Sequence, residues 1–143
     1  RIFMPLSDSD LSILENDATQ LKGKRGIKRL INAFGYSAKG LKACFMNEDA
    51  FRQECMMFSI MLPVALFLPI ETAQKALLCM SLFLVLLVEL LNSAIEAVVD
   101  RIGLELHPLS GLAKDLGSAA VLITLLMTAL VWALVLYDLF FPG

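Results

Sequence analysis

The sequence lacks the signatures of many soluble enzymes. It has neither the GxxxxGK(S/T) loop nor the GxGxxG turn that binds phosphates in common nucleotide-binding folds, so any nucleotide chemistry here uses another fold. Its three cysteines form no CxxC pair and no pattern with the single histidine, so we interpret them as free thiols. Residues 1–20 lack the apolar core of a secretory signal peptide, and we expect none there.

Basic residues are scarce in the second half of the chain, although the net charge is only −2. Nine of the twelve lysines and arginines precede Cys55, and Arg101 and Lys114 flank the loop between the last two apolar segments. By the positive-inside rule, this distribution predicts that the N-terminus and that loop lie in the cytoplasm. With three spans, the C-terminus lies outside.

The composition is typical of a membrane protein. Hydrophobic residues make up 58 % of the 143 residues and the mean hydropathy is +0.74. Average soluble proteins are roughly 45–50 % apolar. The length suits one domain, so the sequence predicts a single all-α, multi-pass membrane domain.

Periodicity divides the chain into a polar tail and this membrane domain. Apolar residues at helical spacing among basic ones predict an amphipathic helix on the membrane surface, with a break at Gly35 or Gly40 left open. Asn47 is a good N-cap for the next helix, whose length of about 31 Å matches a hydrocarbon core of about 30 Å. The predicted segments are the tail 1–24 and the membrane domain 25–143, with a surface helix 25–46 and spans 48–69, 72–102 and 110–140.

Carboxylates enter the second predicted span. The run from Glu89 to Gly103, ELLNSAIEAVVDRIG, follows directly on an uncharged apolar segment, and ionisable residues there indicate a functional site. At 3.6 residues per turn its polar residues share one stripe of a single helix: Glu89, Asn92, Ser93, Glu96 and Asp100. A partly desolvated carboxylate at Glu89 suits proton abstraction from an alcohol. A structural hydrogen-bonding role for Glu89 is the alternative.

Three charged residues, one of them on this stripe, are candidates for binding a metal or a phosphate. Glu48 and Glu96 are predicted at the same depth on two helices, where together they could hold Mg²⁺, which takes one or two carboxylates plus phosphate oxygens and water. The alternative for Glu48 taken singly is an acidic residue in the first turn of a helix, and the alternative for Glu96 is a solvated cytoplasmic residue. Lys114, at the start of the third span, suits a phosphate. Its alternative is a snorkelling lysine paired with Asp100 or Asp115.

Together these motifs resemble the signature of the small integral-membrane diacylglycerol kinases of bacteria. The resemblance covers about residues 29–138. The segments that carry it are Gly35–Ser37, Asn47–Glu48, Ala50–Glu54, Glu89–Gly103, Ala113–Asp115 and Gly117–Ala120. It implies a homotrimer of three-span subunits, each with a surface helix, and active sites between subunits. A three-span chain of this size cannot easily enclose so polar a site alone, which also favours an oligomer.

The resemblance implies transfer of phosphate from MgATP to the free hydroxyl of diacylglycerol, giving phosphatidic acid at the bacterial inner membrane. It implies Glu89 as the base and Glu48 and Glu96 as metal ligands. Residues implied to contact the nucleotide are Arg29, Tyr36, Glu48, Glu96, Glu105, His107, Lys114 and Asp115. Residues implied to support the lipid or the site are Gly35, Phe51, Gln53, Glu54, Asn92, Asp100 and Ser118. The predicted partners are diacylglycerol, membrane lipids, ATP and further copies of this chain, with no nucleic acid.

Two other functions remain open. A related undecaprenol kinase of the same fold would phosphorylate a polyprenol instead. A non-enzymatic membrane trimer would use Glu89 and Glu96 for cation passage. This last function leaves the basic surface helix and Lys114 without a role.

Overall fold

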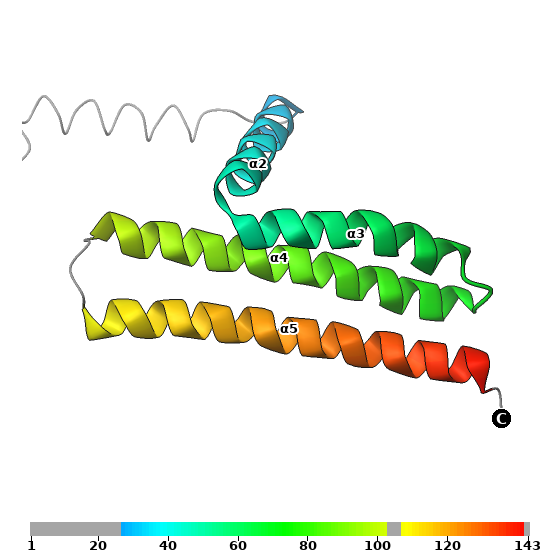
Figure 1. Ribbon diagram of the computed structural model, residues 1–143. Helices are drawn as coiled ribbons and strands as arrows, with labels where there is room; N and C mark the ends of the chain where they lie inside the picture. The colour runs from blue at the N-terminus through cyan, green and yellow to red at the C-terminus, as the bar shows by residue number, and fades with distance from the viewer. Residues whose placement is uncertain (1–26, 103–106, 142–143) are drawn as a thin grey trace, which may run out of the picture. The chain divides into compact units, whose positions relative to one another are not determined.

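The computed structural model describes residues 27–102 and 107–141, and every secondary-structure element within them is an α-helix (Figure 1). This confirms the predicted all-α class. Residues 1–26 and 103–106 fall outside the description, and with them the predicted tail and Glu105. The helices are α2 (Ile27–Asn47), α3 (Asp49–Phe67), α4 (Thr72–Ile102) and α5 (Pro108–Phe140).

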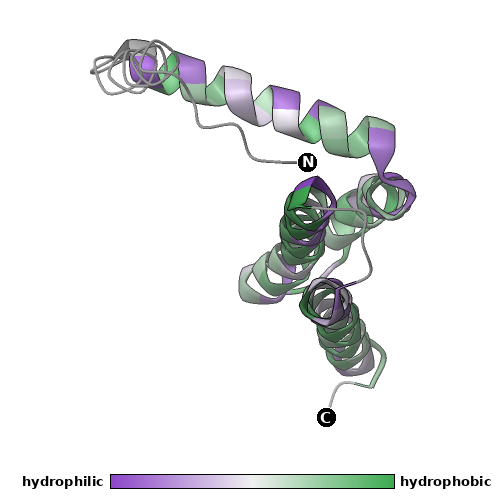
Figure 2. Cartoon of the chain, turned by 90° about the vertical axis from the view of Figure 1, so that its left-hand side faces the viewer, coloured by the Kyte–Doolittle hydropathy of each residue, from purple (hydrophilic) through white to green (hydrophobic). Residues whose placement is uncertain are grey.

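Helix α2 occupies the segment for which a surface helix is predicted. It is continuous through Gly35 and Gly40, so neither glycine breaks it. Hydrophilic and hydrophobic residues alternate along it, whereas α4 and α5 are mainly hydrophobic (Figure 2). The part of α2 up to Gly40 belongs to one of the two compact units of the chain, and the part from Leu41 onward belongs to the other. Its contact with a membrane surface stays a prediction.

The predicted N-cap of α3 is wrong by one residue. Asn47 ends α2, and its side-chain amide donates to the carbonyl of Ala43 at 2.7 Å. The N-cap of α3 is Glu48, whose backbone is extended and whose side chain makes no capping hydrogen bond. The side chain of Asn47 therefore bonds within its own helix and does not cap α3. Because the Glu48 carboxylate makes no capping hydrogen bond either, it is available for other contacts.

A guanidinium group stabilises the corner between α2 and α3. Arg52 donates to the carbonyls of Phe45 and Met46 at 3.1 and 3.2 Å and pairs with the carboxylate of Asp49. The last carbonyls of a helix lack partners within the helix. Arg52 satisfies two of these carbonyls and so holds the end of α2 against the start of α3.

Helices α3, α4 and α5 are each long and apolar enough to cross a membrane. The second span matches its predicted bounds, 72–102, while the first is shorter than 48–69 and the third begins two residues before 110. Only 17–28 % of the residues in their most hydrophobic windows are buried within the chain. Most of their apolar surface is therefore available to lipid or to other subunits.

Helix α4 packs against both neighbours, with α3 along one side and α5 along the other (Figure 1). Near the end of the bundle where α3 leads into α4, side chains of all three helices form one hydrophobic cluster: Ala65, Leu78, Leu82, Trp132 and Val135. At the same end, Gln74 donates to the carboxylate of Asp138 at 2.7 Å. These contacts fix the three spans beside one another and leave the polar residues at the opposite end.

Candidate active site

Two buried carboxyl groups lie near one another, one on α3 and one on α4. Glu89 is 4 % exposed and Glu54 is 8 % exposed, and their charges interact. One oxygen of Glu54 has no hydrogen-bond partner, and no ion pair within 27–102 and 107–141 involves either residue. Burial of unpaired charge is costly. Such a pair persists where function requires it.

The polar stripe of α4 runs from buried to exposed. Glu89 and Asn92 are buried, Ser93 and Glu96 are half-buried, and Asp100 is exposed. Because α4 is one uninterrupted helix, Glu96 lies about 10 Å from Glu89 along its axis. The stripe therefore joins a desolvated carboxylate to groups that water and soluble ligands reach.

Glu96 is held by the residue one turn before it. The side-chain nitrogen of Asn92 donates to a carboxylate oxygen of Glu96 at 3.1 Å. The other end of the Asn92 amide lies against Gly117 of α5 and has no conventional hydrogen-bond donor. Asn92 therefore connects the packing of α4 on α5 to the orientation of Glu96.

The end of α2 is tied to the same stripe. The buried thiol of Cys44 donates to the hydroxyl of Ser93 at 3.4 Å. Burial raises the pKa of the Cys44 thiol, and the nearby carboxylates of Glu48 and Glu89 raise it further. The thiol is therefore a neutral donor at physiological pH, and it brings Glu48, four residues further along the chain, towards α4.

Glu48 and Glu96 together suit a divalent cation. Both carboxylates are half-buried and both act electrostatically on Glu89, although they come from the start of α3 and from α4. Within 27–102 and 107–141 no group of three His, Cys, Asp or Glu side chains gathers as a complete metal site. The donor set fits a hard cation that takes its other ligands from phosphate and water, as Mg²⁺ does.

Lys114 is paired across helices. Its ammonium lies 2.6 Å from a carboxylate oxygen of Asp100, which confirms the pairing that the sequence left open. Lys114 is half-buried and Asp115 and Ser118, on the same helix, are exposed. A cation and two polar groups therefore face outward beside the exposed end of the α4 stripe.

His107 has a structural role in the described part of the chain. It is the N-cap of α5, and its side-chain nitrogen accepts from the backbone of Leu109 at 3.2 Å. Arg29, Gly35 and Tyr36 are exposed on the separate part of α2, so their relation to the site stays a prediction. Glu105 lies outside the described residues.

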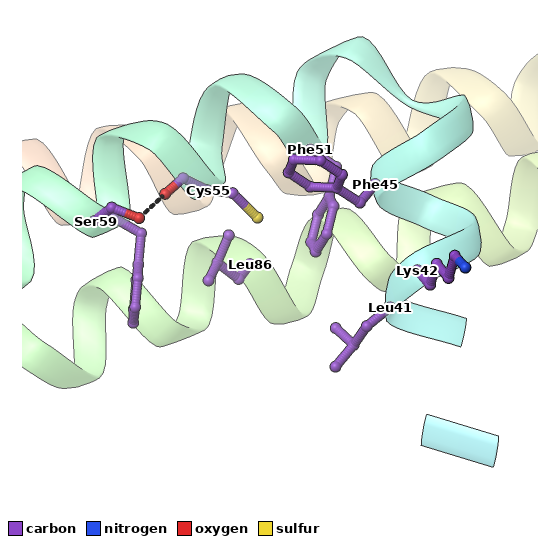
Figure 3. A pocket seen from close by; sticks show the side chains of 8 residues that line it. Leu41, Lys42, Phe45, Phe51, Cys55, Ser59 and Leu86 are labelled. Carbon is purple, nitrogen blue, oxygen red and sulfur yellow. Dashed lines mark hydrogen bonds between the residues drawn. The ribbon is translucent and has the colours of Figure 1, made fainter. Parts of the chain in front are cut away.

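An apolar pocket of about 440 Å³ opens where the end of α2 meets α3 and α4 (Figure 3). Its lining residues are Leu41, Lys42, Phe45, Phe51, Cys55, Phe58, Ser59 and Leu86. The hydroxyl of Ser59 donates to the carbonyl of Cys55 at 2.8 Å, and the Lys42 amine points away from the other lining side chains (Figure 3). Leu86 is one turn of α4 before Glu89, so the pocket adjoins the buried carboxylates. Gln53, by contrast, is exposed.

Comparison with known proteins identifies the family. Residues 35–136 match the model of the family Prokaryotic diacylglycerol kinase. This chain belongs to that family. A diacylglycerol kinase of Escherichia coli K12 is 50 % identical over 115 residues, which are 80 % of this chain and 94 % of that protein. The diacylglycerol kinase of Pseudomonas aeruginosa is 49 % identical over 80 % of this chain and 94 % of that protein. The diacylglycerol kinase of Helicobacter pylori 26695 is 41 % identical over 81 % of this chain and 91 % of that protein.

Two contacts in this diacylglycerol kinase family member are not predicted from its sequence. One is the hydrogen bond from Cys44 to Ser93, for which no local pattern gives a signal. The other is the close approach of Gly117 to Asn92. The small residues from Gly117 to Ala120 do indicate tight helix packing, but they do not say which partner is approached.

Proposed function

We propose that this protein transfers the γ-phosphoryl group of ATP to the free hydroxyl of diacylglycerol, giving phosphatidic acid and ADP. The observation that carries the proposal is the buried Glu89, which lies between an apolar pocket and a polar stripe that ends in solvent. A reaction between a lipid and a soluble donor needs this arrangement. Family membership, with relatives named diacylglycerol kinase, specifies the lipid.

The pocket receives part of the lipid's acyl chains. Its lining is mainly aliphatic and aromatic, and one of its walls is the buried ring of Phe51. With the chains there, the glycerol hydroxyl would lie near Glu89, one helical turn from Leu86. Glu54, the second buried carboxyl group, lies close enough to Glu89 to interact with it electrostatically, and would help to orient the hydroxyl.

Glu89 is the general base. Its carboxylate takes the proton of the lipid hydroxyl as that oxygen forms a bond to the γ-phosphorus. The bond between the γ-phosphorus and the β–γ bridging oxygen breaks, and ADP carries the electron pair away. Catalysis of this transfer depends mainly on positioning and on charge neutralisation.

Glu48 and Glu96 would hold Mg²⁺ on the nucleotide. Bound there, Mg²⁺ supplies positive charge that offsets the triphosphate, which the clustered carboxylates would otherwise repel. Asn92 keeps one Glu96 oxygen in place through its hydrogen bond. Lys114 binds a phosphate oxygen directly, exchanging its contact with Asp100 for one with the nucleotide.

The remaining predicted nucleotide residues complete the proposal. Asp115 and Ser118 are exposed on α5 and are available to a ligand at the α4 stripe. Arg29, Tyr36, Glu105 and His107 are proposed as further nucleotide contacts, and Gly35 and Gln53 as supports of the site.

The protein would act as a homotrimer in the bacterial inner membrane, with its N-terminus in the cytoplasm and its C-terminus outside. Among the described spans, α4 packs against both α3 and α5, and most of the apolar surface of the three spans is unburied. The exposed polar residues of the site therefore need a second copy to exclude water and enclose the nucleotide.

The test is γ-phosphate transfer from radiolabelled ATP in mixed micelles, with diacylglycerol and undecaprenol compared side by side. We expect labelled phosphatidic acid from the wild-type protein and none from Glu89→Gln, which should keep the oligomer and its nucleotide binding. Glu71→Gln, which changes an exposed carboxylate at the other end of the spans, is the matched control. Label found only in polyprenyl phosphate would show that the lipid substrate is a polyprenol rather than diacylglycerol. No label in either lipid would contradict the kinase proposal.

A further inference from the structure

Gly117 of α5 is buried against the side chain of Asn92 on α4. A Cβ atom placed on Gly117 would lie 2.2 Å from Oδ1 of Asn92 and 3.3 Å from its Cγ. Real Cβ contacts are essentially never shorter than 3.0 Å. A side chain at residue 117 would therefore have to displace the Asn92 amide.

The same geometry accounts for the oxygen of Asn92 that has no conventional donor. On glycine, the direction of the missing Cβ is taken by a Cα hydrogen, so a Gly117 Cα–H bond points at Oδ1. Such Cα–H···O contacts are weakly favourable and common where helices pack closely. They satisfy an oxygen that is otherwise without a partner in the buried interface.

This contact also selects the orientation of the amide. With Oδ1 directed at Gly117, the side-chain nitrogen faces Glu96 and donates to it at 3.1 Å. The reversed amide would place the oxygen beside the Glu96 carboxylate, where two acceptors repel, and the NH₂ group against a carbon. Gly117 and Glu96 thus specify the two ends of one amide.

We propose that Gly117 is a positioning residue that acts through Asn92 to hold the Glu96 carboxylate in its cation-binding orientation. The inference rests on the proposed function only in assigning Glu96 to a divalent cation. A methyl group on residue 117 would displace the Asn92 amide by about 1 Å, the difference between 2.2 Å and an ordinary C···O contact. The bond to Glu96 would break while the backbones stay packed.

The test measures cation binding and stability separately from turnover. Purified protein in detergent with a non-hydrolysable ATP analogue is titrated with Mn²⁺ and followed by electron paramagnetic resonance, and the thermal midpoint is recorded without metal. The variants are Gly117→Ala, Asn92→Ala and the double variant. Gly111→Ala is the matched control, because it lies on the same helix and a Cβ there meets nothing within 4 Å.

We expect Gly117→Ala and Asn92→Ala each to weaken Mn²⁺ binding by about tenfold or more, as loss of ligand-orienting contacts typically does. The double variant should bind no more weakly than Asn92→Ala alone, because the methyl group then enters the space that the amide left. Gly111→Ala should bind as the wild-type protein does. Wild-type Mn²⁺ affinity in Gly117→Ala, or independent losses that multiply in the double variant, would overturn the inference.

Folding defects do not obscure the result. If Gly117→Ala alone fails to fold, the double variant should fold with the thermal midpoint of Asn92→Ala, whereas failure of both would show that Asn92 is not what the methyl group meets. A wild-type protein that phosphorylates diacylglycerol while Gly117→Ala keeps normal Mn²⁺ binding would refute this inference alone. Absence of both Mn²⁺ binding and phosphorylation in the wild-type protein would refute the proposed function as well.

Discussion

The ammonium of Lys114 and the carboxylate of Asp100 form an ion pair of 2.6 Å between α5 and α4. Both side chains are partly exposed to solvent, and ion pairs of this kind add little to stability. The pair instead keeps a cation beside the α4 stripe in the absence of a ligand. We therefore expect Lys114 to contribute to nucleotide affinity rather than to the stability of the fold.

Replacing Lys114 by methionine should separate these two effects. We expect Lys114→Met to raise the KM for ATP by at least about tenfold, because a charge-assisted contact with phosphate is lost, while the thermal midpoint stays nearly unchanged. Steady-state kinetics and a thermal melt measure both. Lys75→Met, at the opposite end of α4, is the control and should leave the KM for ATP unaltered. An unchanged KM in Lys114→Met would remove this residue from the nucleotide site.

The buried carboxyl of Glu54 should cost stability. One of its oxygens lacks a partner and Glu89 lies close by, so an apolar side chain of similar size avoids both penalties. We expect Glu54→Met to increase the free energy of unfolding by about 1–3 kcal/mol, the usual cost of a buried unsatisfied group, and to reduce turnover. Denaturation in mixed micelles gives the first quantity. The control is Glu71→Met, which replaces an exposed carboxylate in the turn between α3 and α4 and should change neither quantity. A destabilised Glu54→Met would mean that another subunit supplies the missing partner.

The helices of this chain are predictable because their signals are local. Each span is an apolar run, Pro69 lies in the turn between α3 and α4, and the bounds of the span 72–102 agree with those of α4. The third span begins earlier than predicted because His107 caps it and Pro108 occupies a position that tolerates proline. The error at Asn47 arises because its amide bonds backwards to Ala43, a choice between two helices that propensity does not determine.

The site is predictable along one helix but not between helices. The order of burial from Glu89 to Asp100 follows from the period of α4 and the depth of its apolar part. The contacts of Cys44 with Ser93 and of Gly117 with Asn92 depend on how neighbouring helices are rotated against α4. Rotation is set by the summed packing of many side chains, which no single motif encodes.

The two proposed cation ligands should respond to magnesium concentration. We expect Glu48→Gln and Glu96→Gln each to raise the Mg²⁺ concentration for half-maximal activity by about tenfold or more, because one charged ligand is lost in each case. Titration of MgCl₂ at fixed total ATP measures this. Activity of the wild-type protein should vanish with excess EDTA and return with Mg²⁺. A normal magnesium dependence in both variants would contradict the assignment of Glu48 and Glu96 as Mg²⁺ ligands.

The apolar pocket can be filled without touching the polar stripe. Cys55 lines it from α3, so Cys55→Phe should occupy volume needed by the lipid and raise the KM for long-chain diacylglycerol severalfold, with less effect on short chains. The KM for ATP should stay constant. Met56→Phe, whose side chain is 65 % exposed on the same helix, is the control. Equal KM values for both lipids in Cys55→Phe would place the acyl chains elsewhere.

The thiol of Cys44 should titrate at unusually high pH. Burial, reinforced by the carboxylates around it, raises its pKa above 9.0, so at any pH below that value a smaller fraction is thiolate than in the unfolded chain. In a Cys55→Ala/Cys79→Ala background, the rate of alkylation by N-ethylmaleimide should therefore still be rising at pH 9. The same chain unfolded in SDS should reach half its maximal rate near the ordinary thiol value. Because burial alone would slow the reaction equally at every pH, the midpoint of the profile, rather than the rate, is decisive, and a folded-state midpoint at or below 9.0 would contradict the buried, hydrogen-bonded Cys44.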